Sequence, residues 1–211
     1  EQKDLLSIKE EKCFALAMSP YKTLSMDKKT REKILLRLKS KQAQDSVLIQ
    51  AENYNEIAYA KYAPNTILDM FIRTTTKHRK THLNIKLSKE FINYMFSDEA
   101  SKWKKFSFIK LVVNDDKLQH LQESLLNVDN QNVGADSNFL LGLNQLKHEQ
   151  IQEAINSFKT SRGQYTRQMS KDKNSFWMYQ ATKDKEHLSD LALSMDINIY
   201  SLYAKEKLGI E

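Results

Sequence analysis

The chain has 211 residues, a formal net charge of +6, 40% hydrophobic residues and 28% charged residues. This balance predicts a soluble globular protein with no transmembrane segment, because membrane helices need long runs without charge and disordered chains have few apolar residues. Only 4 glycines and 2 prolines are present. Sandwiches and propellers need frequent turn glycines and nucleotide folds need a glycine-rich loop, so these classes are excluded and an all-α fold is expected.

Apolar residues recur at helical spacing in units of roughly 12–20 residues. Asp27 and Ser88 precede two such units and are expected to cap them. Pro64 is expected to close the helix before it, because proline lacks the N–H that a helix interior needs. The expected helix faces are Ala51, Tyr54, Ala58 and Tyr62; Ile67, Met70, Phe71 and Thr74; Leu118, Leu121 and Leu125; Ile151, Ala154, Ile155 and Phe158; and Leu188, Leu191, Ala192 and Met195.

Residues 106–113 have the β-branched and aromatic character of a strand. We expect a buried helix there, because a lone strand has no partner in a chain with so few other strand signals. About ten to twelve short helices joined by tight turns do not form a simple four-helix bundle. The expected architecture is an α-solenoid, or superhelix, of stacked helical hairpins.

A hairpin of the tetratricopeptide (TPR) type is predicted in the C-terminal third. Leu141 and Gly142 are followed by Ala154, twelve residues after the glycine, and by Phe158 four residues later. In such a hairpin the small residue lets the second helix approach the first, and the alanine and the large apolar residue fill the contact.

The TPR match is partial, because Asn138 and Gln145 stand where aromatic residues are usual and no second clean copy follows at a 34-residue period. We expect two regions. Residues 1–130 form a basic array of helical hairpins, and residues 131–211 form TPR-like repeats.

Positive charge is concentrated in the first half of the chain. Residues 1–110 carry 22 Lys and Arg against 13 Asp and Glu, whereas residues 111–211 carry 11 against 14. Residues 73–89, called the basic segment below, contain no carboxylate and predict a positive potential toward an anionic glycan, nucleic acid or acidic membrane. The alternative is a solvated lysine-rich face, because interleaved aromatics and glycines are missing, and nucleic acid is the unfavoured partner. The candidate anion contacts are Arg73, Lys77, Arg79, Lys80, Lys86 and Lys89.

No metal or cofactor site is expected. His78 and His82 are four residues apart and can share a helix face, but no third ligand is positioned beside them. Cys13 is the single cysteine, so no intrachain disulfide is possible, and its apolar surroundings predict core packing and not a nucleophile.

Gln122, Glu123 and Ser124, followed by residues 133–135 and 142–146, resemble the catalytic signature of goose-lysozyme-like murein transglycosylases. In that family the glutamate acts as acid and base. Asn144 replaces the methionine of the family's groove motif, the spacing from glutamate to glycine is longer, and the family's later motif is absent. The leucines of this helix predict a core-facing element, so we expect Glu123 not to be catalytic.

Residues 175–181, with Trp177, and residues 198–209, with Tyr200 and Tyr203, resemble the last repeat of the helical superhelix of soluble lytic murein transglycosylases. There an aromatic-Trp-x-x-Ala helix precedes a Tyr-x-x-x-Ala-x-x-x-Leu-Gly helix that leads into the catalytic domain. Within the family these aromatic residues pack helices. The close match covers about a sixth of the chain.

The resemblance implies that this chain is the non-catalytic superhelix of a periplasmic peptidoglycan lytic transglycosylase, whose catalytic domain forms 1,6-anhydromuropeptides. The sequence begins at Glu1 and not with methionine, so we expect a processed protein or an excised piece and a removed signal peptide is permitted. The implied partners are peptidoglycan glycan strands, guided by the basic segment, and the catalytic domain in cis. The competing hypotheses are a TPR-like adaptor that binds a protein on its concave face and, third, an RNA-binding helical domain.

Overall fold

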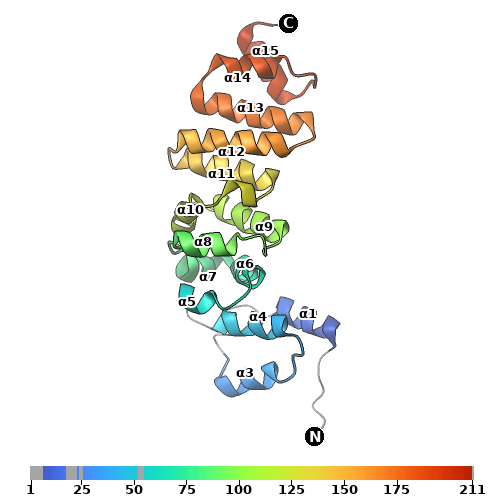
Figure 1. Ribbon diagram of the computed structural model, residues 1–211, viewed down its shortest axis with the longest axis vertical. Coiled ribbons are helices and arrows are strands. Elements are labelled where there is room, and N and C mark those ends of the chain that lie inside the picture. Colours follow the sequence, from blue (N-terminus) through green and yellow to red (C-terminus); the bar gives the residue numbers. More distant parts are fainter. Residues whose placement is uncertain (1–6, 18–22, 24–25, 52–54, 211) are drawn as a thin grey trace.

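The computed structural model describes residues 7–17, 23, 26–51 and 55–210, and within these ranges every regular element is helical. The all-α fold expected from the sequence is confirmed. Helices that are neighbours in the sequence are neighbours in space, so the described helices form an elongated stack, with α3 toward one pole and α15 at the other (Figure 1).

The helices fall into three groups along this stack. The N-terminal group contains α1 (Ile8–Ala17), α3 (Lys28–Leu35), α4 (Lys41–Ala51) and α5 (Glu56–Tyr59). The middle group contains α6 (Pro64–Arg73), α7 (Thr76–His78), the π-helical turn η1 (Arg79–Leu83), α8 (Lys89–Met95), α9 (Lys102–Val113), α10 (Gln119–Leu125) and the 3-10 turn η2 (Asn130–Asn132). The C-terminal group contains α11 (Ala135–Lys147), α12 (Ile151–Gln164), α13 (Gln168–Thr182), α14 (Lys185–Ala192) and α15 (Ile199–Leu208).

Two predicted N-caps and the predicted buried helix are confirmed. The side chain of Asp27 accepts a hydrogen bond from the Thr30 N–H at 2.8 Å, and that of Ser88 accepts one from the Phe91 N–H at 3.1 Å. These bonds satisfy N–H groups that have no partner within the first turn. The strand-like residues 106–113 lie in α9, where the fully buried side chain of Phe108 contacts the rings of other core aromatics.

The predicted helix that ends at Pro64 is wrong. Pro64 is the first residue of α6, a position where its missing N–H has no partner to lose. A separate short helix, α5, begins after Asn55, whose side chain accepts hydrogen bonds from two N–H groups of the first turn. The predicted face is therefore divided between α4, which ends at Ala51, and α5, while Tyr54 lies outside the described residues.

Two further expectations about apolar side chains are wrong. Cys13 is exposed, because α1 packs through Phe14, which contacts the apolar cluster of α3 and α4, and the adjacent residue points elsewhere. Met195 is 97% exposed, because α14 ends at Ala192 and the chain beyond it leaves the helix face.

The apolar interior is a series of clusters along the stack. The largest cluster joins α4, α6, α8, α9, α10 and α11, and smaller clusters follow between α11, α12 and α13 and between α13, α14 and α15. Val133 and Leu141 belong to the largest cluster, so apolar contacts cross the expected division at residue 130. The two regions expected from the sequence therefore share one apolar cluster around residue 130.

In the C-terminal group, α11 and α12 form a hairpin with a very close contact. A Cβ atom added to Gly142 would lie 2.5 Å from Cε1 of Phe158, so any larger residue would force the buried ring of Phe158 to move. Ala154 and Phe158 are fully buried, and Leu141 reaches the larger cluster on the other side of α11. The spacing of these residues in the sequence corresponds to this contact.

Hydrogen-bonded amides fill the places where a TPR-type hairpin has aromatic residues. The Gln145 Oε1 atom accepts a hydrogen bond from the Ser157 hydroxyl at 2.6 Å. The Asn138 Nδ2 atom donates to the Asn130 carbonyl at 3.0 Å and to Gln164 Oε1 at 3.2 Å. Both amides are buried, where a polar group needs such partners, so α11 and α12 are joined by polar as well as apolar contacts.

Candidate functional site

The basic segment runs from the end of α6 through α7 and η1 to the first residue of α8. Its most buried cationic residue is Arg79, which is 5% exposed. The Arg79 Nε atom donates to the Phe71 carbonyl at 3.1 Å, and Nη2 donates to the carbonyls of Ile72 at 3.2 Å and Thr74 at 2.5 Å. Arg79 therefore occupies carbonyls at the end of α6 that have no partner within the helix.

The expectation that Arg79 is a surface contact for an anion is wrong. Burial lowers the pKa of its guanidinium, and the nearby carboxylate of Asp115 opposes that change. The charge is compensated by backbone carbonyls inside the protein. Arg79 stabilises the fold at this position and is not available to a ligand.

Two lysines of the basic segment form ion pairs with the neighbouring layer. Lys80 Nζ lies 3.1 Å from Asp115 Oδ2, and Lys86 Nζ lies 3.5 Å from Glu123 Oε2. Burial by itself raises the pKa of Asp115, but the Lys117 N–H bond and the Lys80 ammonium bring it below its usual value. These pairs reduce the positive potential that the sequence alone predicts.

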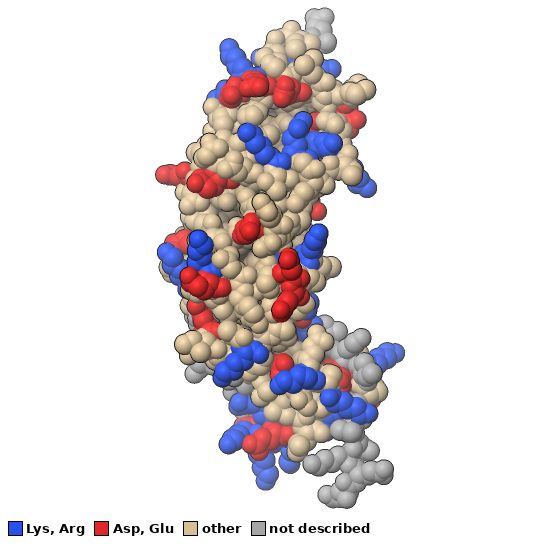
Figure 2. All heavy atoms as spheres, in the orientation of Figure 1, with Lys and Arg blue, Asp and Glu red and all other residues tan. Residues whose placement is uncertain are grey.

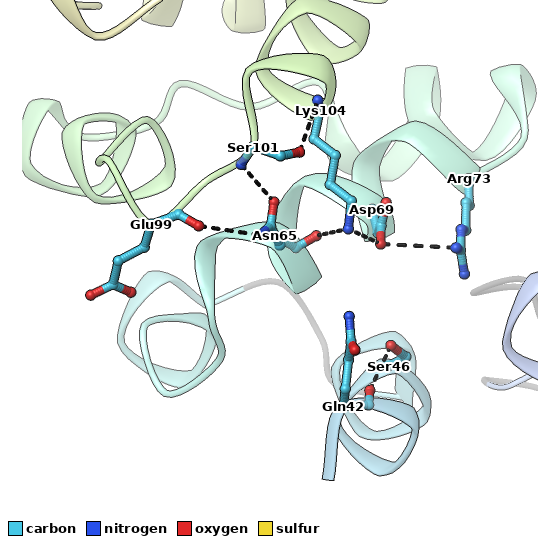
Figure 3. Close-up of polar contacts among 8 residues, drawn as sticks. All are labelled: Gln42, Ser46, Asn65, Asp69, Arg73, Glu99, Ser101 and Lys104. Carbon is cyan, nitrogen blue, oxygen red and sulfur yellow. Dashed lines mark hydrogen bonds and ion pairs between the residues drawn. The ribbon is translucent and has the colours of Figure 1, made fainter. Parts of the chain in front are cut away.

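Arg73 belongs to a polar cluster that joins α6 to α9 (Figure 3). Its Nη2 atom lies 3.8 Å from Asp69 Oδ2, and the same oxygen lies 2.5 Å from Lys104 Nζ. Asn65 accepts a hydrogen bond from the Ser101 N–H at 2.9 Å, which holds the start of α9. The positive charge of Arg73 thus acts partly within the protein.

Lys77 and Lys89 remain as exposed ammonium groups of the basic segment, and neither forms an ion pair among the described residues. Between them, the rings of His78 and His82 have centroids 4.4 Å apart. Burial lowers the pKa of His78, and the nearby His82 adds to this effect. Within the described residues, no group of three histidine, cysteine or acidic side chains is placed to hold a metal ion.

Glu123 lies on α10, where its carboxylate forms the ion pair with Lys86. The Gln122 side chain donates to the carbonyls of Val112 at 3.0 Å and Asp115 at 3.1 Å, and Asn144 donates to the Gln122 carbonyl at 2.9 Å. The residues of the apparent catalytic signature therefore join α9, α10 and α11.

The aromatic residues of the C-terminal resemblance lie between α13, α14 and α15. The ring of Phe176 lies 5.4 Å from that of Tyr200 and 5.2 Å from that of Tyr203, measured between centroids. Trp177 packs against the preceding cluster, between α11, α12 and α13. These side chains connect successive layers of the stack, with ring distances typical of aromatic pairs.

Sequence reasoning missed two surface features. Trp103 is 70% exposed at the mouth of a cleft of about 520 Å³ between α9 and the start of α11. In the sequence, Trp103 lies three residues before Phe106 and off the buried face of α9, and this spacing indicates an aromatic pair on the exposed side of the helix. The second feature is a set of exposed apolar side chains after α14, which we call the C-terminal apolar surface: Leu193, Met195, Ile197 and Ile199.

No known protein family matches this sequence, and no curated protein is recognisably similar to it. The class that the structure defines is an elongated all-α stack of helical hairpins. No helix of the described ranges has the length and apolar character needed to cross a membrane.

Proposed function

We propose that this chain is the non-catalytic superhelical scaffold of a peptidoglycan lytic transglycosylase. The observation that carries the proposal is the aromatic contact between α13 and α15, since Phe176, Tyr200 and Tyr203 belong to the segments that resemble the family. The residues that resemble the family therefore contact one another and join two layers of the stack. The elongated stack of hairpins supports the same proposal.

The scaffold guides glycan strands by charge. The first 110 residues carry the whole positive surplus of the chain, and basic side chains gather at the N-terminal end of the face in Figure 2. Such a surplus attracts an anionic polymer over several ångströms without a fixed site. Lys77 and Lys89 supply the contacts of the basic segment, because they are exposed and form no ion pair among the described residues, whereas its other cations are buried or, like the exposed Lys86, paired.

The scaffold also holds a catalytic domain in cis. Exposed apolar patches commonly mark interaction surfaces. The C-terminal apolar surface lies beside α15, the helix that leads into the catalytic domain in the family that this chain resembles. We therefore assign this surface to contact with that domain.

Cosedimentation with purified murein sacculi tests the glycan contact. The double variant Lys77→Glu, Lys89→Glu is expected to lower binding several-fold at low salt, with a smaller difference at high salt because the charges are screened. The matched control is Lys159→Glu, Lys185→Glu, which makes the same charge change at exposed positions of the C-terminal group. Equal losses in both variants, or no binding by the parent chain, contradict the proposal.

The alternative function is a protein-binding adaptor, and the C-terminal apolar surface is the observation that favours it. A photo-crosslinking residue at Met195 in cells separates the two functions. A crosslink within the same polypeptide supports the scaffold, whereas a crosslink to a second protein supports the adaptor.

A further inference from the structure

A cleft of about 520 Å³ lies between the beginning of α9 and the beginning of α11. It is lined by Lys102, Trp103, Phe106, Gly134, Ala135, Asp136 and Ser137. Its volume falls within the range of small-molecule sites, about 300–1,000 Å³, and is sufficient for one or two sugar units.

The exposed aromatic ring of Trp103 is the unusual feature of this cleft. Phe108, Ile109 and Val112 of the same helix are fully buried, so α9 has a complete core face without Trp103. Phe106 lies one turn further on and is half-buried in the same cleft. A tryptophan that is 70% exposed beside a cleft contributes little to the core and presents a flat apolar surface to a ligand.

Two groups of opposite charge lie at the rim of the cleft. The ammonium of Lys102 is a hydrogen-bond donor, and the carboxylate of Asp136 is an acceptor. The Tyr165 hydroxyl donates to Asp136 Oδ1, which orients the carboxylate. Burial raises the pKa of Tyr165, and Asp136 raises it further, so the hydroxyl stays protonated and remains a donor. Among the described residues no other donor occupies Oδ2 of Asp136.

This combination of groups selects among ligand classes. A pyranose ring has an apolar C–H face that stacks on an aromatic plane, and hydroxyl groups around its edge that both donate and accept hydrogen bonds. Trp103 offers the plane, Asp136 accepts from hydroxyls, and Lys102 donates to them. A phosphate group is disfavoured by the carboxylate, and a purely apolar side chain leaves both charges without partners.

We propose that the cleft formed by Trp103, Phe106, Lys102 and Asp136 binds a hexopyranose unit of a glycan strand. The inference rests on the proposed function, to which it adds a contact with the sugar ring itself. The basic segment attracts the strand by charge, whereas this cleft recognises the face and edge of one sugar.

The test is titration of the purified chain with N-acetylglucosamine tetramer, followed by calorimetry and by tryptophan fluorescence. Trp103→Ala is expected to weaken binding by about tenfold, because truncating a central aromatic contact usually has a large effect. Trp103→Phe is expected to retain part of the affinity, and Asp136→Asn to weaken it by about threefold. Trp177→Phe is the matched control, since Trp177 packs against another cluster, and it is expected to bind as the parent does.

Each outcome either supports or contradicts the proposal that the cleft binds a sugar. Tetramer binding that is lost in Trp103→Ala, with an unchanged helical circular dichroism spectrum, supports it. Tetramer binding that is equal in Trp103→Ala and the parent overturns it, as does binding of murein stem peptides in place of the sugar. If the tetramer does not bind but sacculi binding depends on Lys77 and Lys89, the sugar site is contradicted and the proposed scaffold function is supported. If the parent binds neither tetramer nor sacculi, both proposals fail.

Discussion

Arg79 stabilises the middle of the molecule by binding three backbone carbonyls at the end of α6. Replacing it with leucine leaves these carbonyls without their donors, and we expect the free energy of unfolding to fall by about 2–4 kcal/mol. The exposed Lys77→Leu is the control, with an expected change of less than about 0.5 kcal/mol. Urea unfolding followed by circular dichroism measures both variants, and similar small changes in the two contradict the role of Arg79 as a cap.

His78 is expected to make the stability of the middle group of helices decrease at acidic pH. Its pKa lies below the usual 6.5 in the folded protein, because burial and the nearby His82 disfavour the charged form. The unfolded chain therefore binds more protons, so this contribution to stability is complete above pH 6.5 and is lost as the pH falls toward the folded-state pKa.

We expect the free energy of unfolding to decrease between about pH 7.5 and pH 5.5, and His78→Gln to reduce that decrease. The other ionisable groups are the same in both proteins, so the difference between them reports the loss of His78 together with its interaction with His82. Urea unfolding at the two pH values makes the comparison. A variant with the same pH dependence as the parent rules out this effect.

At the scale of the elements, Gly142 determines how closely α11 and α12 pack. Gly142→Leu forces the added side chain against the buried ring of Phe158 and is expected to lower the free energy of unfolding by about 1–3 kcal/mol. Gly163 on α12 is the matched control, because a Cβ added there meets nothing within 4 Å. Gly163→Ala is expected to raise stability by about 0.5–1 kcal/mol, since alanine is the better helix former. Thermal unfolding that shifts in the same direction for both variants contradicts the close contact.

The elements that the sequence predicts best depend on local chemistry. Asp27 and Ser88 cap helices whose first turns lie beside them in the chain, and the spacing of Gly142 and Phe158 is a property of one hairpin. Pro64 was ambiguous, because proline both ends helices and occupies their first position. The structure shows that Pro64 begins α6, and that the preceding helix, α5, is a separate element whose first turn is capped by Asn55.

The candidate site was less predictable, because its contacts join different elements. A run of cations indicates a surface, but the partners of Arg79 are backbone carbonyls, which a sequence pattern does not display. The partners of Lys80 and Lys86 lie more than thirty residues away along the chain. Trp103 fits the pattern of a helix, and only the position of α11 beside it leaves its ring at a cleft.

At the scale of the whole molecule, the apolar clusters follow one another along the stack, as in repeat proteins whose layers contact only their neighbours. Phe158→Ala, in the cluster between α11, α12 and α13, should therefore weaken that part of the stack most. We expect amide hydrogen exchange to become faster in α11, α12 and α13 than in α6 and α8. A uniform increase across all helices contradicts this division and indicates a single cooperative unit.

If the chain is the scaffold proposed above, it binds murein and does not cleave it. One experiment tests both parts: the purified chain is incubated with murein sacculi, the pellet is assayed for bound protein, and the supernatant is analysed by mass spectrometry for soluble muropeptides. We predict that the chain sediments with the sacculi and that no 1,6-anhydromuropeptides are released, because Glu123 is ion-paired with Lys86 and does not line the cleft beside Trp103. The proposed function is contradicted if the chain stays in the supernatant. It is also contradicted if the chain releases anhydromuropeptides and the Glu123→Gln variant does not.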